Sequence, residues 1–172
     1  MSPEQDKQAM IGLIEREWHS TDKWLRSLND RQLDLPVFGE GPGWKVRDMI
    51  THMAWWQDLA AQVAEKIAKE GGAPTESSRR FLGIERSADD LNVETFETWR
   101  GRPMADRWDR WLRAHSRMMD GLRALTPVQL LQPEGTEGGM EGIRLAFAMP
   151  ALVHLRRHKE HIEAALKETP KA

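Results

Sequence analysis

The chain of 172 residues contains no cysteine and no tyrosine. The absence of cysteine excludes disulfide bonds, thiolate metal ligands and a cysteine nucleophile, and it is compatible with a reducing compartment. Because tyrosine is absent, aromatic packing depends on eight tryptophans and four phenylalanines. Most of the tryptophans recur at helical spacing, which favours packing in the core over a ligand cage.

Long apolar runs and an excess of one charge are also missing. No segment approaches the roughly 18 apolar residues of a membrane span, and the N-terminal MSPEQDKQAM lacks the features of a secretory signal. The net charge is -2, and the basic residues are scattered rather than gathered into a footprint for nucleic acid or an anionic membrane. We therefore expect a cytoplasmic protein that acts on a small molecule and binds neither nucleic acid nor membrane.

Apolar residues spaced three and four apart predict four amphipathic helices. These helices are expected at about residues 3–29, 46–69, 103–125 and 140–167. The sequence shows neither the alternation of apolar and polar residues that is typical of β-strands nor any internal repeat. The pattern predicts one all-α domain over residues 1–172, folded as a four-helix bundle.

The connections between these helices carry the glycines and prolines. Residues 31–45 form the first connection, and residues 133–139 form a loop before the fourth helix. The connection between the second and third helices, through residues 73–103, is unusually long, and we expect one or two short helical turns in it, around 93–99. Pro150 lies inside the fourth helix and predicts a kink or a restart there, because proline lacks the N–H group of a regular turn.

Three of the six histidines lie within eight residues, in 154-HLRRHKEHIEAAL-166. His154 and His158 are four residues apart and share one helical face, where two imidazoles can bind one cation. His52, in 49-MITHMAWWQ-57, lies at the edge of the apolar stripe of the second helix and supplies a candidate third ligand. Without a third ligand, the pair of His154 and His158 is typical of a solvated helix face. His52 alone is typical of a buried structural histidine. Together, three imidazoles in a bundle would leave metal positions open for water or substrate.

Two motifs resemble the DinB/YfiT-like superfamily of metal-dependent four-helix-bundle proteins. GPGWKVRDMITHMAWW at residues 41–56 is similar to the start of that family's first ligand helix, and HLRRHKEHI at residues 154–162 is similar to its last. The segment 84–103 also resembles the connection before the third helix in some of these proteins. Pro150 departs from the pattern, because several relatives continue a regular helix there.

The resemblance implies that His52, His154 and His158 bind a divalent ion such as Ni²⁺, Zn²⁺ or Fe²⁺. Relatives with assigned activity include transferases and isomerases that use a low-molecular-weight thiol such as bacillithiol or mycothiol. A divalent ion lowers the pKa of a bound thiol or water, which supplies a nucleophile at neutral pH. Because the chain has no cysteine, the nucleophile would come from a cosubstrate or from solvent, as in a thiol-dependent transferase or a metal-dependent hydrolase.

Two other classes of function are compatible with the same sequence. One is a non-catalytic bundle that binds or protects a small apolar compound, and the other is a structural dimer without metal. No catalytic residue can be assigned from the sequence. Whichever function applies, we expect a homodimer, because the long connection carries the apolar side chains of Phe81, Leu82, Phe96 and Trp99.

Further charged residues near the histidines have competing interpretations. His161 could support a metal ligand, act as a proton shuttle or simply be solvated, and we favour the last two. Asp48 could orient His52, although aspartate is favoured in the first turn of any helix by the helix dipole. Arg156 and Arg157 are expected to face solvent, with contact to an anionic substrate as the alternative.

Overall fold

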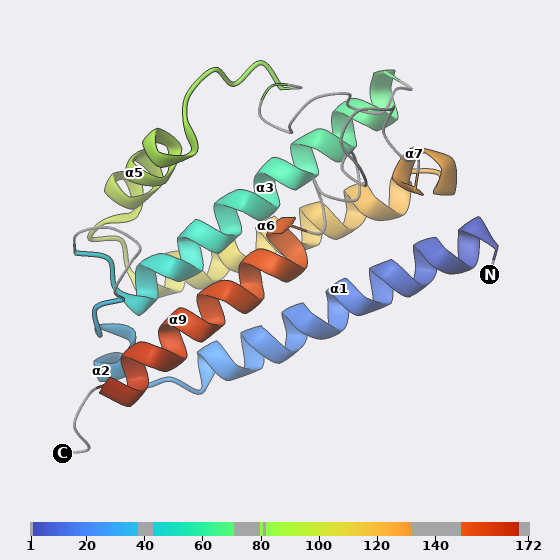
Figure 1. The fold of residues 1–172 in the computed structure, drawn as a ribbon. Helices are drawn as coiled ribbons and strands as arrows, with labels where there is room; N and C mark the ends of the chain where they lie inside the picture. The colour runs from blue at the N-terminus through green and yellow to red at the C-terminus, as the bar shows by residue number, and fades with distance from the viewer. Residues whose placement is uncertain (1, 38–42, 71–79, 81, 132–148, 169–172) are drawn as a thin grey trace.

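Four long helices form the body of the protein in the computed structural model, which describes residues 2–37, 43–70, 80, 82–131 and 149–168 (Figure 1). They are listed here in chain order: α1 (Pro3–Arg26), α3 (Val46–Glu70), α6 (Met104–Ala124) and α9 (His154–Glu168). Shorter helices lie between them: α2 (Asp30–Leu33), α5 (Ala88–Trp99), α7 (Pro127–Leu131) and the π-helical turn η1 (Met149–Val153). The all-α four-helix bundle predicted from the sequence is confirmed.

Side-chain contacts between the helices show in which direction each helix runs relative to its neighbours. Ion pairs join the beginning of α3 to the beginning of α6, and the ends of both helices are joined in the same way, so these two helices run parallel. Helices α1 and α9 also run parallel to each other, and both run opposite to α3 and α6 (Figure 1). Helix α9 therefore passes α3 in the antiparallel sense, and the contacts of His52 with His154 and His158 show that the two helices overlap near their N-terminal ends.

The beginning of α1 is fixed both locally and across the bundle. Ser2 caps the helix in a reciprocal capping box with Gln5, and Pro3 occupies the first turn. The buried side chain of Lys7 reaches the far end of α6, where its Nζ donates hydrogen bonds to the backbone oxygens of Arg123 and Leu125. A lysine here satisfies carbonyl groups that the end of a helix leaves without partners.

Helices α3 and α6 approach closely because small residues meet at their contact. A Cβ atom added to Gly121 would lie 2.7 Å from the Cβ of Ala64, which is closer than two carbon atoms can pack. By contrast, a Cβ at Gly12 of α1 would meet only the end of the exposed Arg16 side chain, at 3.2 Å. The two glycines therefore offer a matched pair for testing the packing.

We expect Gly121→Ala to destabilise the protein by about 1–3 kcal/mol, because the two helices must move apart to admit the methyl group. Gly12→Ala should be neutral or stabilising by up to about 1 kcal/mol, the difference in helix propensity between the two residues. Urea unfolding of both variants measures the difference. Equal stability of the two variants would contradict the close packing of α3 on α6.

The structure corrects three details of the sequence prediction. Helix α5 is a full helix of 12 residues rather than one or two turns, and its N-cap is Ser87, whose side chain accepts a hydrogen bond from the Asp90 N–H. Helix α2 was not predicted, although Asn29 and Gln32 form a capping box there. Helix α6 begins at Met104 rather than at the predicted residue 103, and Pro103 is its N-cap residue.

Pro150 lies in η1, and a regular α-helix resumes at His154. The kink or restart expected at this proline is thus present as a π-helical turn. The loop predicted at residues 133–139 and the predicted start of the fourth helix lie outside the described residues. Among the helices that are described, none has the length and hydropathy to cross a membrane.

Candidate metal centre

The antiparallel contact between α3 and α9 brings three histidines together. The Nε2 atom of His52 lies 3.1 Å from Nε2 of His154 and 3.1 Å from Nε2 of His158. The Nε2 atoms of His154 and His158, one helical turn apart, are separated by 2.7 Å. The convergence expected from the sequence is therefore present, and within the described residues this is the group of side chains whose geometry could hold a metal ion.

The spacing of the three nitrogens fits a shared cation. Metal–nitrogen distances of about 2.0–2.1 Å put neighbouring ligand nitrogens roughly 3 Å apart when they meet at near-right angles. Three imidazoles suit Zn²⁺, Ni²⁺ and Fe²⁺, and they leave further positions of the ion open. The donor set and its spacing are thus compatible with a divalent ion bound by three imidazoles.

Two tryptophans flank the three rings. Trp44, just before α3, meets the ring of His52 edge-on at 5.2 Å, and Trp56 meets the ring of His154 at 5.5 Å. His52 and His158 are buried. Burial lowers the pKa of His154 to about 2, and the neighbouring His158 and His52 act in the same direction. A neutral imidazole is the form that binds metal, so His154 offers its lone pair at any physiological pH.

The other candidate residues have different surroundings. The ring of His161 lies 5.8 Å from that of His158, one turn further along α9. Arg156 is exposed and forms an ion pair of 2.5 Å with Glu17, and Arg157 is exposed as well. Both arginines therefore face solvent as expected.

Asp48 belongs to a buried ion pair that the sequence prediction missed. Its Oδ1 lies 3.0 Å from Nη1 of Arg107, and both side chains are at least nine-tenths buried. Its Oδ2 accepts a hydrogen bond from the Lys45 N–H at the start of α3. These contacts match the helix-terminus interpretation of Asp48, one turn before His52.

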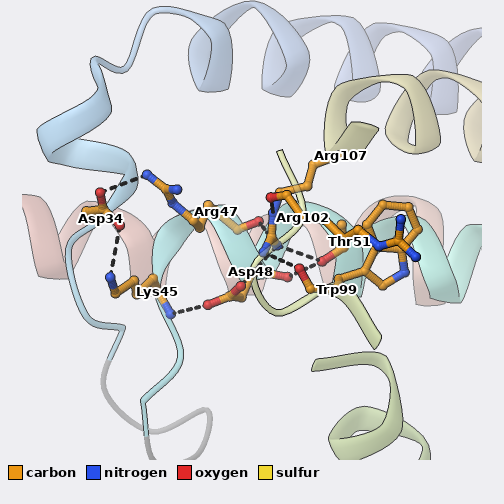
Figure 2. Close-up of polar contacts among 8 residues, drawn as sticks. All are labelled: Asp34, Lys45, Arg47, Asp48, Thr51, Trp99, Arg102 and Arg107. Carbon is orange, nitrogen blue, oxygen red and sulfur yellow. Dashed lines mark hydrogen bonds and ion pairs between the residues drawn. The ribbon is translucent and has the colours of Figure 1, made fainter. Parts of the chain in front are cut away.

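Arg107 links three segments of the chain (Figure 2). Its guanidinium donates to the backbone oxygens of Arg47 at 3.2 Å, Trp99 at 2.6 Å and Arg102 at 3.3 Å. The first turn of α3 is thereby tied to the end of α5 and to the start of α6. A signal for this role existed, because Arg107 lies at an inward position of α6, four residues before the buried Trp111. A cation on an apolar stripe requires buried partners.

His115, on α6, is also buried and lies apart from the three convergent rings. It stacks on Trp18 with ring centres 3.9 Å apart. Burial lowers its pKa from 6.5 to about 4, helped by the nearby His19 and Arg123. The folded protein therefore holds this imidazole neutral, and the unfolded chain binds its proton more readily.

Stability should fall between about pH 6.5 and pH 4, because the unfolded state gains a proton at His115 before the folded state does. The loss from this residue should be on the order of 2 kcal/mol by about pH 4.5. His115→Phe retains an aromatic ring on Trp18 and should reduce the pH dependence by that amount. Urea unfolding of both proteins with a chelator present, at several pH values, measures it, and identical slopes would contradict the burial of a neutral His115.

Fold and site together define a class, the DinB/YfiT-like helical bundles that the two sequence motifs resemble. A comparison with protein families supports this class, because the model of the mycothiol maleylpyruvate isomerase N-terminal domain matches residues 14–156. The chain belongs to this family, which is part of the DinB/YfiT-like superfamily of helical metal-binding proteins. Searches of curated proteins and of solved structures each found no match.

Proposed function

We propose that this protein binds one divalent metal ion through His52, His154 and His158 and uses it in thiol-dependent transfer to a small molecule. The observation that carries the proposal is the convergence of three Nε2 atoms within 3.1 Å of one another. The metal would be Ni²⁺, Zn²⁺ or Fe²⁺, since all three accept imidazole ligands. The thiol cosubstrate is supported by the family description, which names mycothiol.

A bound divalent ion would stabilise the thiolate form of a thiol at neutral pH. The residues of this chain would bind the ion and surround it. His154 remains neutral through burial, so protons do not compete for its ring nitrogen. Trp44 and Trp56 place apolar ring surface beside His52 and His154, and His52 and His158 are buried, so a bound ion would have partly apolar surroundings. Because the chain itself has no cysteine, the thiol must arrive with the cosubstrate.

Metal content is the first test of the proposal. Protein purified without a histidine tag should contain about one divalent ion per chain by elemental analysis. If no stoichiometric ion is present, and none binds on titration with Ni²⁺, Zn²⁺ and Fe²⁺, the metal site is refuted. The non-catalytic or structural alternatives would then take its place.

The loaded protein distinguishes the two kinds of nucleophile. A thiol cosubstrate should bind only when metal is present, and its thiolate should produce a charge-transfer band with Ni²⁺ or Fe²⁺. Turnover of esters or amides without any thiol would favour metal-dependent hydrolysis instead. Quenching of tryptophan fluorescence by a small apolar compound in metal-free protein would favour a non-catalytic binding role.

A homodimer and a cytoplasmic location remain proposals. The apolar side chains that motivated the dimer are partly used within the chain. Phe96 stacks on Trp44 at 5.3 Å, and Leu82 packs against the core, while Phe81 lies outside the described residues. The exposed Val93, Val128 and Val153 offer other apolar surface. The mass in solution, measured by light scattering, decides between monomer and dimer.

A further inference from the structure

A cavity of about 400 Å³ lies at the end of the bundle where α3 begins. Its walls come from the segment around the start of α3, from the end of α5 with the turn that follows, and from the first turn of α6. Five basic residues line it, which are Lys45, Arg47, Arg100, Arg102 and Arg107, against two acidic ones, Asp34 and Asp48. This excess of positive charge is local, because the whole chain carries a net charge of -2.

Both carboxylates in the wall are already neutralised by basic partners (Figure 2). Asp34 lies 2.9 Å from Nζ of Lys45 and 2.8 Å from Nη2 of Arg47. Asp48 is paired with the buried Arg107. Neither carboxylate of the wall is therefore paired with Arg100 or Arg102, the remaining arginines of the cavity.

Three N–H-bearing groups of the wall lack a strong acceptor. Arg102 has no side-chain ion pair or hydrogen bond to any described residue, and Arg100 has only a long contact of 3.6 Å to the exposed Glu97. The Nε atom of Arg47 is buried and has no hydrogen-bond partner in the described part of the chain. A buried N–H group without an acceptor costs free energy, and a bound anion would recover it.

The turn between Arg100 and Arg102 contains Gly101. Gly101 has a φ of 80°, in the left-handed region that glycine adopts without strain, and a Cβ added there would meet no atom within 4 Å. Gly43, which also lines the cavity, has a φ of 83° and equally open surroundings. Both glycines leave room beside the arginines.

We propose that this cavity binds a small anion with a carboxylate or phosphate group, recognised by Arg100 and Arg102 with support from Arg47. Planar guanidinium groups suit both kinds of oxyanion, because two parallel N–H groups can donate to two oxygens. The site would be separate from the three histidines. Trp44 lies between them, with its ring 5.2 Å from that of His52 and 5.3 Å from that of Phe96, which lines the cavity.

Titration calorimetry on the full chain tests the proposal with two probes, inorganic phosphate and malonate. The protein is treated with a chelator and kept at low ionic strength, so that anion binding to a metal cannot contribute. At least one probe should bind saturably at one site per chain. Tighter binding of phosphate or of malonate then identifies the group that the site prefers.

The variant Arg100→Gln with Arg102→Gln should weaken binding at least about tenfold, the effect of losing one charge-assisted hydrogen bond. Both side chains are exposed, so the melting temperature should change little. The matched control is Arg117→Gln with Arg123→Gln. It also removes two positive charges, but from exposed ion pairs on α6 outside the cavity. This control should bind the probe like the wild type.

Two results would overturn the proposal. One is the absence of saturable binding of either probe below roughly 10 mM. The other is equal weakening in both double variants, which would show that general charge rather than the cavity attracts the anion. Neither result depends on whether the histidines bind metal.

Discussion

His158→Ala is expected to lose its metal ion while the bundle stays folded. His158 supplies one of three convergent nitrogens, so its removal leaves only two ligands. The affinity should fall by more than about a hundredfold, since the loss of a residue that merely supports a ligand already costs 10–100-fold. Helix α9 should persist, because Leu155, Ile162 and Ala165 anchor it in the core and alanine favours helix. Competition with a chelating dye measures the affinity, and circular dichroism measures the helix.

His161→Ala is the matched control on the same helix. Its ring lies next to that of His158 but outside the group of three convergent nitrogens. Metal affinity should therefore change little in this variant, and thiol-dependent activity would fall if His161 moves a proton. Retention of metal in His158→Ala together with release from His161→Ala would show that the proposed ligand set is wrong.

Arg107→Ala is expected to destabilise the protein by about 3–5 kcal/mol, the range for removing one member of a buried ion pair. The substitution leaves the buried Asp48 without its partner, and it also leaves the backbone oxygens of Arg47, Trp99 and Arg102 without their donor. Because α5 and the start of α6 are tied to α3 through this guanidinium, the loss should extend to all three helices. Urea unfolding followed by circular dichroism measures the change.

Lys45→Ala provides the comparison for Arg107→Ala. Its side chain forms an exposed ion pair with Asp34, which lies at the same end of the bundle. The expected cost is below about 1 kcal/mol, as for other exposed pairs. Similar small losses in both variants would mean that Arg107 does not hold the segments together.

The bundle could be predicted from the sequence because each long helix carries its own apolar stripe. Ile14 and Trp18 in α1, and Met118 and Leu122 in α6, are pairs four residues apart, and all four side chains are buried in the structure. That period depends only on local geometry, so no knowledge of the neighbouring helices was needed. Short helices such as α2 have no room for a stripe, and only their capping residues indicate them.

The three histidines could be proposed because two of them lie one turn apart, and because the surrounding motifs resemble a known family. Arg107 was missed for a different reason. Its partners include the backbone oxygens of Trp99 and Arg102, and backbone groups carry no sequence signal of where the chain will place them. The cavity beside it was missed as well, since its walls come from three separate segments whose approach depends on the packed fold.

The π-helical turn η1 sets the angle at which α9 presents its histidines. Each residue of a regular α-helix advances the chain by about 100° around the axis. A π-helical turn holds one more residue than an α-helical turn, so the wide turn over Met149–Val153 delays the rotation before His154 is reached. A regular α-helix over the same five residues would turn His154 and His158 further around the axis relative to Met149, and so away from His52 on α3. Because η1 also packs against α1 and α3, the wide turn lets this packing and the orientation of the two histidines toward His52 occur together.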